Sequence, residues 1–98
     1  GKGDTMKNTG ARKVFERLVA IAVELTRPEG VNAPKLASRF EVSTKTIQRD
    51  LDFMRSNLLL DIRYEQQGRC RGMWRPGKWR TEDVERVQGI KAVFSNLH

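Results

Sequence analysis

Three long polar side chains, those of Lys45, Gln48 and Arg49, lie close together in the sequence and could contact nucleic-acid bases. Arginine can pair with both acceptors of guanine, glutamine with both groups that adenine presents, and lysine with guanine or a phosphate. These residue types are also good helix formers, so an ordinary solvated helix face would have the same composition. Which interpretation holds depends on the elements that position these side chains.

Apolar residues recur after Ser43 at steps of four, three and four, which predicts a helix with one buried face. These apolar residues are Ile47, Leu51, Met54 and Leu58. Ser43 is a suitable N-cap for this helix, and together with Thr46 and the unpaired amides of the first turn it can hold a phosphate. The N-terminal half of the exposed face then carries Thr44, Lys45, Gln48 and Arg49. Lys35, on the preceding helix, is a further candidate DNA contact.

The sequence before Ser43 predicts two more helices. The first covers residues 11–26 and is ended by residues 27–30, which include a proline and a glycine. The second begins after Asn32, a suitable N-cap, and ends at Phe40. Because only Glu41 and Val42 separate Phe40 from Ser43, the two helices must cross steeply, as in a helix-turn-helix. Many such turns have glycine where Glu41 stands, so a strained dihedral is expected there.

Two short strands are predicted after these helices. Apolar and polar residues alternate over 60–65, Gln67-Gly68 indicates a turn, and a second strand is expected near 71–75. Arg69 and Arg71 at the tip would reach phosphates or a narrow minor groove, where arginine is favoured. A solvated turn is the alternative interpretation of this tip.

The composition favours one small basic domain. The chain has 98 residues and a net charge of +7, and residues 58–80 alone sum to +4. That segment also contains Tyr64, Trp74 and Trp79, so its cations are interleaved with aromatic residues. A polyanionic partner is therefore favoured. With no membrane-spanning or leader segment in the sequence, we expect a cytoplasmic, nucleoid-associated protein.

Catalysis and metal binding are not expected. Cys70 is the single cysteine, so an internal disulfide is excluded, and Cys70 with His98 cannot complete a structural zinc site. His98 is the last residue, and no nucleophile with a positioned base or paired carboxylates is evident. We expect no enzymatic activity and no cofactor, and no small-molecule ligand is identifiable.

Two segments carry a family resemblance, VSTKTIQRDLDFMRSNL (Val42–Leu58) and the preceding LASRF (Leu36–Phe40). With the Gly-containing ribbon that follows, they resemble the N-terminal DNA-binding domain of DeoR-type bacterial regulators and of related regulators that carry a WYL domain. The resemblance covers roughly residues 14–75. It implies a winged helix-turn-helix transcription regulator, commonly a repressor, whose third helix enters the major groove. The effector-binding domain that normally follows in both families is not within these 98 residues.

Other side chains are expected to have structural roles. Asp50 would repel phosphate if it faced DNA, so we expect it to pair with a cation such as Arg39 or Arg55, while Asp52 lies further along the helix. Phe53 is expected to cover the edge of the core, as are both tryptophans. Cys70 is interpreted as a passive thiol.

The last helix is expected from Thr81, an N-cap followed by two acidic residues. Its apolar stripe consists of Val84, Val87, Ile90, Phe94 and Leu97. We interpret this stripe as the interface of a homodimer, because regulators of this kind commonly place two copies on a two-fold site. The alternative is that the helix packs on the first helix of its own chain.

These patterns predict a mainly α fold with a small β-hairpin, that is, a winged helix-turn-helix. The expected organisation is a disordered segment 1–10, a DNA-binding domain 11–80 and a C-terminal helix 81–98. The expected function is sequence-specific binding of double-stranded DNA as a transcription regulator. The alternatives are a winged-helix module for protein association or for RNA, or the N-terminal fragment of a longer effector-controlled regulator.

Overall fold

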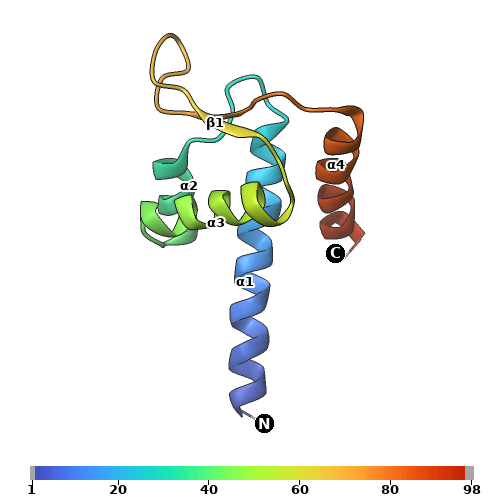
Figure 1. Cartoon of the computed structure of the whole chain (residues 1–98). Helices are drawn as coiled ribbons and strands as arrows, with labels where there is room; N and C mark the ends of the chain where they lie inside the picture. Colours follow the sequence, from blue (N-terminus) through green and yellow to red (C-terminus); the bar gives the residue numbers. More distant parts are fainter. Residues whose placement is uncertain (1, 97–98) are drawn as a thin grey trace.

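The protein is mainly helical, with one two-stranded antiparallel sheet. The computed structural model describes the backbone of residues 2–96 and the side chains of residues 12–92. The elements are α1 (Lys2–Leu25), α2 (Ala33–Phe40), α3 (Thr44–Asn57), β1 (Ile62–Tyr64), β2 (Trp74–Pro76) and α4 (Thr81–Asn96). Figure 1 shows α3 crossing α1, α4 running alongside α1, and the hairpin at one end of the molecule. The expected combination of helices with one small hairpin is confirmed.

The core forms where α1 meets α3 and α4. Ile47, Leu51 and Met54 of α3 are fully buried, as their spacing predicts, and pack in one cluster with Ile21 of α1. Leu58, the last residue of the predicted stripe, is partly buried against the same cluster. Burying one such side chain contributes roughly 1.5–3 kcal/mol to stability. The core therefore fixes which face of α3 remains exposed.

The first helix is longer than its apolar pattern indicates. It begins at Lys2, whereas residues 1–10 were expected to be disordered, and in Figure 1 its N-terminal half extends beyond the other elements. The packed segment from Val19 to Leu25 nucleates the helix. Extending a nucleated helix costs little free energy per residue, and the sequence before Pro28 contains no proline that would stop it. The helix ends at Leu25 and Gly30 completes the turn with φ 87°. A Cβ on Gly30 would lie 2.5 Å from the Trp74 carbonyl oxygen, so glycine is required here.

The hairpin is shorter than the alternation over 60–65 predicts. Ile62 pairs with Pro76 and Tyr64 with Trp74, and residues 65–73 form the connecting loop. Gly68 and Gly72 both have φ 86°, which turns the backbone out of the strand conformation before the expected second strand can start. Beyond this sheet, the Val31 backbone forms an isolated bridge with Trp74. Its N–H donates to the Trp74 carbonyl at 2.7 Å and its carbonyl accepts from Trp74 at 2.9 Å.

Asp61 fixes the root of the hairpin. Its carboxylate accepts from the Lys78 backbone N–H at 2.7 Å and from Arg63 Nη2 at 3.0 Å. Its carbonyl accepts from Trp79 Nε1 at 2.7 Å. The hydrogen bond from the Arg63 side chain, followed by that from Lys78, holds the pKa of Asp61 below its ordinary value. Trp74 and Trp79 pack against the core, as expected.

Helix α4 packs along α1 and belongs to the core of its own chain. Val87 is fully buried and Ile90 packs against the core cluster, which corresponds to the alternative to a dimer interface. Val84 is exposed, while the side chain of Phe94 and all of Leu97 lie outside the described residues. The expected cap is corrected too. Thr81 is the first residue of α4 and does not precede it, and at this helix start the Asp83 carboxylate accepts the Arg80 backbone N–H at 2.8 Å.

Candidate nucleic-acid interface

The turn between α2 and α3 has the geometry that its length requires. Glu41 adopts φ 56° and ψ 44°, the left-handed conformation, so the strained dihedral expected there is confirmed. For a residue with a Cβ this conformation costs roughly 1–2 kcal/mol. The Glu41 N–H donates to Ser38 and the Val42 N–H donates to the Ala37 carbonyl at 2.9 Å, which closes the end of α2. The backbone thus reverses within two residues and directs α3 across α2.

The start of α3 is capped as its sequence predicts. The Ser43 Oγ accepts from the Thr46 backbone N–H at 3.2 Å and lies 3.1 Å from the Thr46 Oγ1. The Thr46 amide is therefore occupied by the cap. A phosphate at this helix start would meet the amides of Thr44 and Lys45 instead, because the first amides of a helix have no partner within it.

The candidate base-contacting side chains lie on the exposed face of α3. Lys45, Gln48 and Arg49 are all exposed and Thr44 is half-exposed, as the buried stripe predicts. Within the described part of the chain, no ion pair involves Lys45 or Arg49. Both cations are thus free to meet an anion or a base edge.

Asp50 has a structural role, but its partner differs from the expected ones. Arg17 of α1 donates to its carboxylate through Nε at 2.6 Å and Nη2 at 3.3 Å, and the two side chains are only 12% and 10% exposed. Arg39 instead lies 5.2 Å from the Phe40 ring centroid, and Arg55 pairs with Asp52. Since Asp50 is directed to α1, its charge is withdrawn from the exposed face. Arg17 is thus a positioning residue that the sequence pattern did not indicate.

The remaining acidic residue and the aromatic residue on α3 are both at the surface. Asp52 is exposed and accepts from Arg55 at 3.3 Å, so its charge is balanced along the helix. Phe53 is 46% exposed and is not among the residues packed against the core. The expectation that it covers the edge of the core is therefore wrong. It lies between the fully buried Leu51 and Met54 in the sequence, but on the exposed side of α3.

The hairpin loop carries the two predicted arginines. Arg69 and Arg71 are exposed, and Figure 1 shows their loop projecting at the end of the hairpin, away from the helices. The Arg71 N–H donates to the Gly68 carbonyl at 3.2 Å, which forms a tight turn at the tip. Cys70 between them is a free, partly buried thiol.

Helix α3 and the hairpin flank one open hollow of about 310 Å³. Gln48 and Asp52 line it from α3, and Tyr64 and Trp74 line it from the two strands. The alternation over 60–65 places Tyr64 on the same side of the strand as Leu60 and Ile62, which are buried, yet Tyr64 is 49% exposed. The exposed face of α3 and the hairpin therefore border the same surface. Tyr64 is a member of this surface that the sequence analysis did not include.

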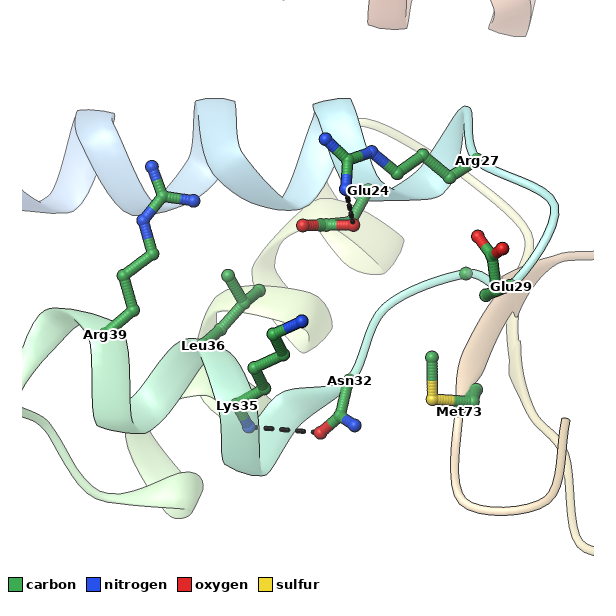
Figure 2. Close-up of a pocket in the computed structure, with 9 residues that line it drawn as sticks. Glu24, Arg27, Glu29, Asn32, Lys35, Leu36, Arg39 and Met73 are labelled. Atoms are coloured by element: carbon green, nitrogen blue, oxygen red, sulfur yellow. Dashed lines mark hydrogen bonds and ion pairs between the residues drawn. The ribbon is translucent and has the colours of Figure 1, made fainter.

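Lys35 lies apart from this surface. Its side chain lines a separate cleft of about 620 Å³ between α1, α2 and the end of the hairpin loop, shown in Figure 2. The Lys35 backbone N–H donates to the Asn32 side chain at 3.0 Å, which confirms Asn32 as the cap of α2. Glu24, Arg27 and Met73 also line the cleft, and Arg27 pairs with Glu24 at 3.5 Å. The cleft shares no lining residue with the hollow beside α3.

Comparisons with known proteins give no indication of function. No protein-family model, curated protein or solved structure matches the chain. Across the described residues, none of the helices has the length and apolar character needed to span a membrane. The same residues contain no group of three or more histidine, cysteine, aspartate or glutamate side chains placed to hold a metal ion.

Proposed function

We propose that this chain is a winged helix-turn-helix module that binds double-stranded DNA sequence-specifically as part of a transcription regulator. In this proposal α3 enters the major groove, as the resemblance to DeoR-type and WYL-associated regulators implies. The hairpin loop follows the backbone or the minor groove. Regulators of this kind are commonly repressors and act as homodimers on two-fold sites, and we extend both features to this protein as part of the proposal.

The observation that carries the proposal is the exposed N-terminal half of α3. It presents Lys45, Gln48 and Arg49 without acidic partners, immediately after a two-residue turn. The two carboxylates of the same helix are neutralised by Arg17 and Arg55. On a helix face that contacts only water, an acidic side chain can remain exposed without a cationic partner. On a face that contacts phosphates and base edges, acidic side chains must be paired or directed away, because an unpaired carboxylate would repel the polyanion.

A module for protein association fits this face less well. Association surfaces are enriched in aromatic and apolar residues at their centre, whereas the long exposed side chains in the N-terminal half of α3 are two cations and one amide. Phe53 and Leu59, the exposed apolar residues nearest in sequence, lie toward or beyond the C-terminal end of α3. The polar half of α3 therefore favours a nucleic-acid partner.

Selection of bound sequences from random duplex DNA tests the proposal directly. We expect a defined preferred site. On that site Arg49→Ala and Gln48→Ala should each lose about 1–3 kcal/mol of binding free energy, with little loss on random duplexes. Arg12→Ala is the matched control for Arg49→Ala, because Arg12 is exposed on α1 and its removal changes the net charge equally.

Three outcomes of this experiment would overturn the proposal. The first is that selection enriches no sequence. The second is that folded Arg49→Ala and Gln48→Ala proteins keep the preference of the parent. The third is that single-stranded RNA or a protein competes for the chain more strongly than duplex DNA does.

A further inference from the structure

The hollow between α3 and the hairpin opens on the surface that carries the proposed base-contacting residues. Gln48 belongs both to the exposed face of α3 and to the lining of the hollow. Tyr64 and Trp74 form the opposite wall, and they face each other across the pairing of β1 with β2. A group that binds α3 beside Gln48 therefore also lies next to this aromatic wall.

The aromatic wall is anchored to the core through Trp74 and partly open to solvent at Tyr64. The Tyr64 and Trp74 ring centroids are 5.1 Å apart with planes inclined at 56°, an arrangement that aromatic pairs favour. Trp74 packs against the core, so it supports Tyr64 from behind. Tyr64 itself keeps 49% of its surface exposed. Covering this surface with an apolar group would release water and stabilise a complex.

The charges in the hollow are already balanced. Asp52 is its charged lining residue, and Arg55 pairs with Asp52 at 3.3 Å. The same guanidinium lies 6.0 Å from the Trp74 ring centroid. No lining residue offers a free cation, so the hollow is poorly suited to a phosphate. It suits a neutral group with an apolar edge, next to an amide that can donate and accept hydrogen bonds.

We propose that this hollow receives the methyl-bearing edge of a thymine, adjacent to the base that Gln48 contacts. This inference rests on the proposed function. The C5-methyl of thymine is the apolar group that DNA presents in the major groove, and proteins recognise it by contact with apolar or aromatic side chains. The volume of about 310 Å³ exceeds that of a methyl group, so the base edge that carries the methyl can enter with it. Tyr64 is then a specificity-determining residue.

Deleting a single methyl group from the DNA tests this assignment. Each thymine of the preferred duplex is replaced in turn by deoxyuridine, which differs only in lacking the C5-methyl. We expect one position at which the replacement weakens binding about fourfold, the effect of burying one methyl group. Tyr64→Ala should bind the thymine duplex about as weakly as the parent binds the deoxyuridine duplex, and should not distinguish the two. Tyr64→Phe retains the ring and should keep the fourfold difference.

A photochemical measurement covers the case in which Tyr64→Ala does not fold. The thymine at the sensitive position is replaced by 5-iodouracil, whose halogen occupies the place of the methyl group. On irradiation the C5–I bond breaks and C5 bonds to a nearby aromatic ring, while the iodine and a ring hydrogen leave as hydrogen iodide. We expect the crosslink at Tyr64 or Trp74. A crosslink at another residue overturns the proposal.

The outcomes separate this inference from the proposed function. A parent protein without any duplex preference overturns both. A parent that selects a site but is indifferent to every deoxyuridine replacement overturns the thymine pocket alone. A folded Tyr64→Ala protein that still distinguishes thymine from deoxyuridine has the same consequence, because the methyl contact would then lie elsewhere.

Discussion

The exposed face of α3 and the hairpin loop carry the same kinds of cations but are held in different ways. Behind Arg49, α3 has fully buried apolar residues and the Arg17–Asp50 pair. Behind Arg69 and Arg71 there is only a loop with two glycines at positive φ, closed by backbone hydrogen bonds at its base. Reading base edges requires fixed directions, whereas attraction to phosphates tolerates movement. The difference indicates that α3 determines sequence preference and that the loop adds sequence-independent affinity.

Breaking the Arg17–Asp50 pair that holds α3 against α1 should have the largest effect, a loss of stability. Asp50→Asn leaves the guanidinium of Arg17 unpaired in a nearly buried position, and we expect a loss of about 3 kcal/mol in the free energy of unfolding. Asp52→Asn is the matched control, because its exposed pair with Arg55 should be worth less than about 1 kcal/mol. Denaturant unfolding of both proteins provides the measurement. Equal stability of the two variants would show that the Arg17–Asp50 pair does not hold α3.

The loop should contribute to affinity without affecting preference. Replacing both Arg69 and Arg71 by alanine should weaken binding to preferred and random duplexes alike, because attraction to phosphates does not depend on base sequence. The slope of log affinity against log salt concentration should fall by about one for each phosphate that the loop no longer neutralises. Binding titrations at several salt concentrations measure both quantities. An altered sequence preference would contradict the division of roles between loop and helix.

A substitution in the turn before α3 should increase the stability of the protein. Glu41→Gly removes the strain of a side chain in the left-handed conformation, and we expect a gain of about 1 kcal/mol in the free energy of unfolding. Thermal unfolding of this variant beside Glu41→Ala separates the backbone effect from loss of the carboxylate. Glycine should stabilise relative to alanine, and the reverse order would contradict the assigned conformation.

The smallest effect concerns the root of the hairpin and its dependence on pH. Since the pKa of Asp61 is lowered in the folded protein, ionised Asp61 contributes stability above the pKa of the unfolded chain. That contribution is lost as the pH falls through the pKa in the folded protein. Asp61→Asn should therefore reduce the stability difference between neutral and acidic pH. Unfolding curves across this range measure it, and parallel pH profiles for parent and variant would contradict the role of Asp61.

Local features of this fold were predictable from sequence and long-range ones were not. Ser43 and Asn32 cap helices through contacts within three residues, so their roles follow from residue type and position. The partner of Asp50 lies on another helix, and neighbouring cations on α2 and α3 were equally reasonable candidates. The apolar period identified Val87 as buried, but periodicity does not indicate whether the same chain or a second copy covers a stripe.

In the candidate site, too, the residues fixed by a local pattern were predictable and those fixed by long-range packing were not. Because α3 has a regular buried stripe, its exposed residues followed directly from the helical period. Tyr64 did not, since alternation along a strand predicts burial only while the strand still runs over the core. Here Ile62 is buried and Tyr64, two residues further, already lies beyond it. The placement of Lys35 depends on where α2 lies relative to α1 across the cleft, which no local pattern specifies.

The backbone bridge between Val31 and Trp74 has a consequence for how the molecule opens. It joins the turn before α2 to strand β2, which follows α3 in the sequence. The bridge therefore forms only after a large loop of the chain has closed. Breaking it requires the helices and the hairpin to separate together. In hydrogen exchange, the amides of Val31 and Trp74 should therefore exchange only through global unfolding, while amides in the hairpin loop exchange through local opening. The segment that carries Arg69 and Arg71 can thus fluctuate while its anchor stays closed.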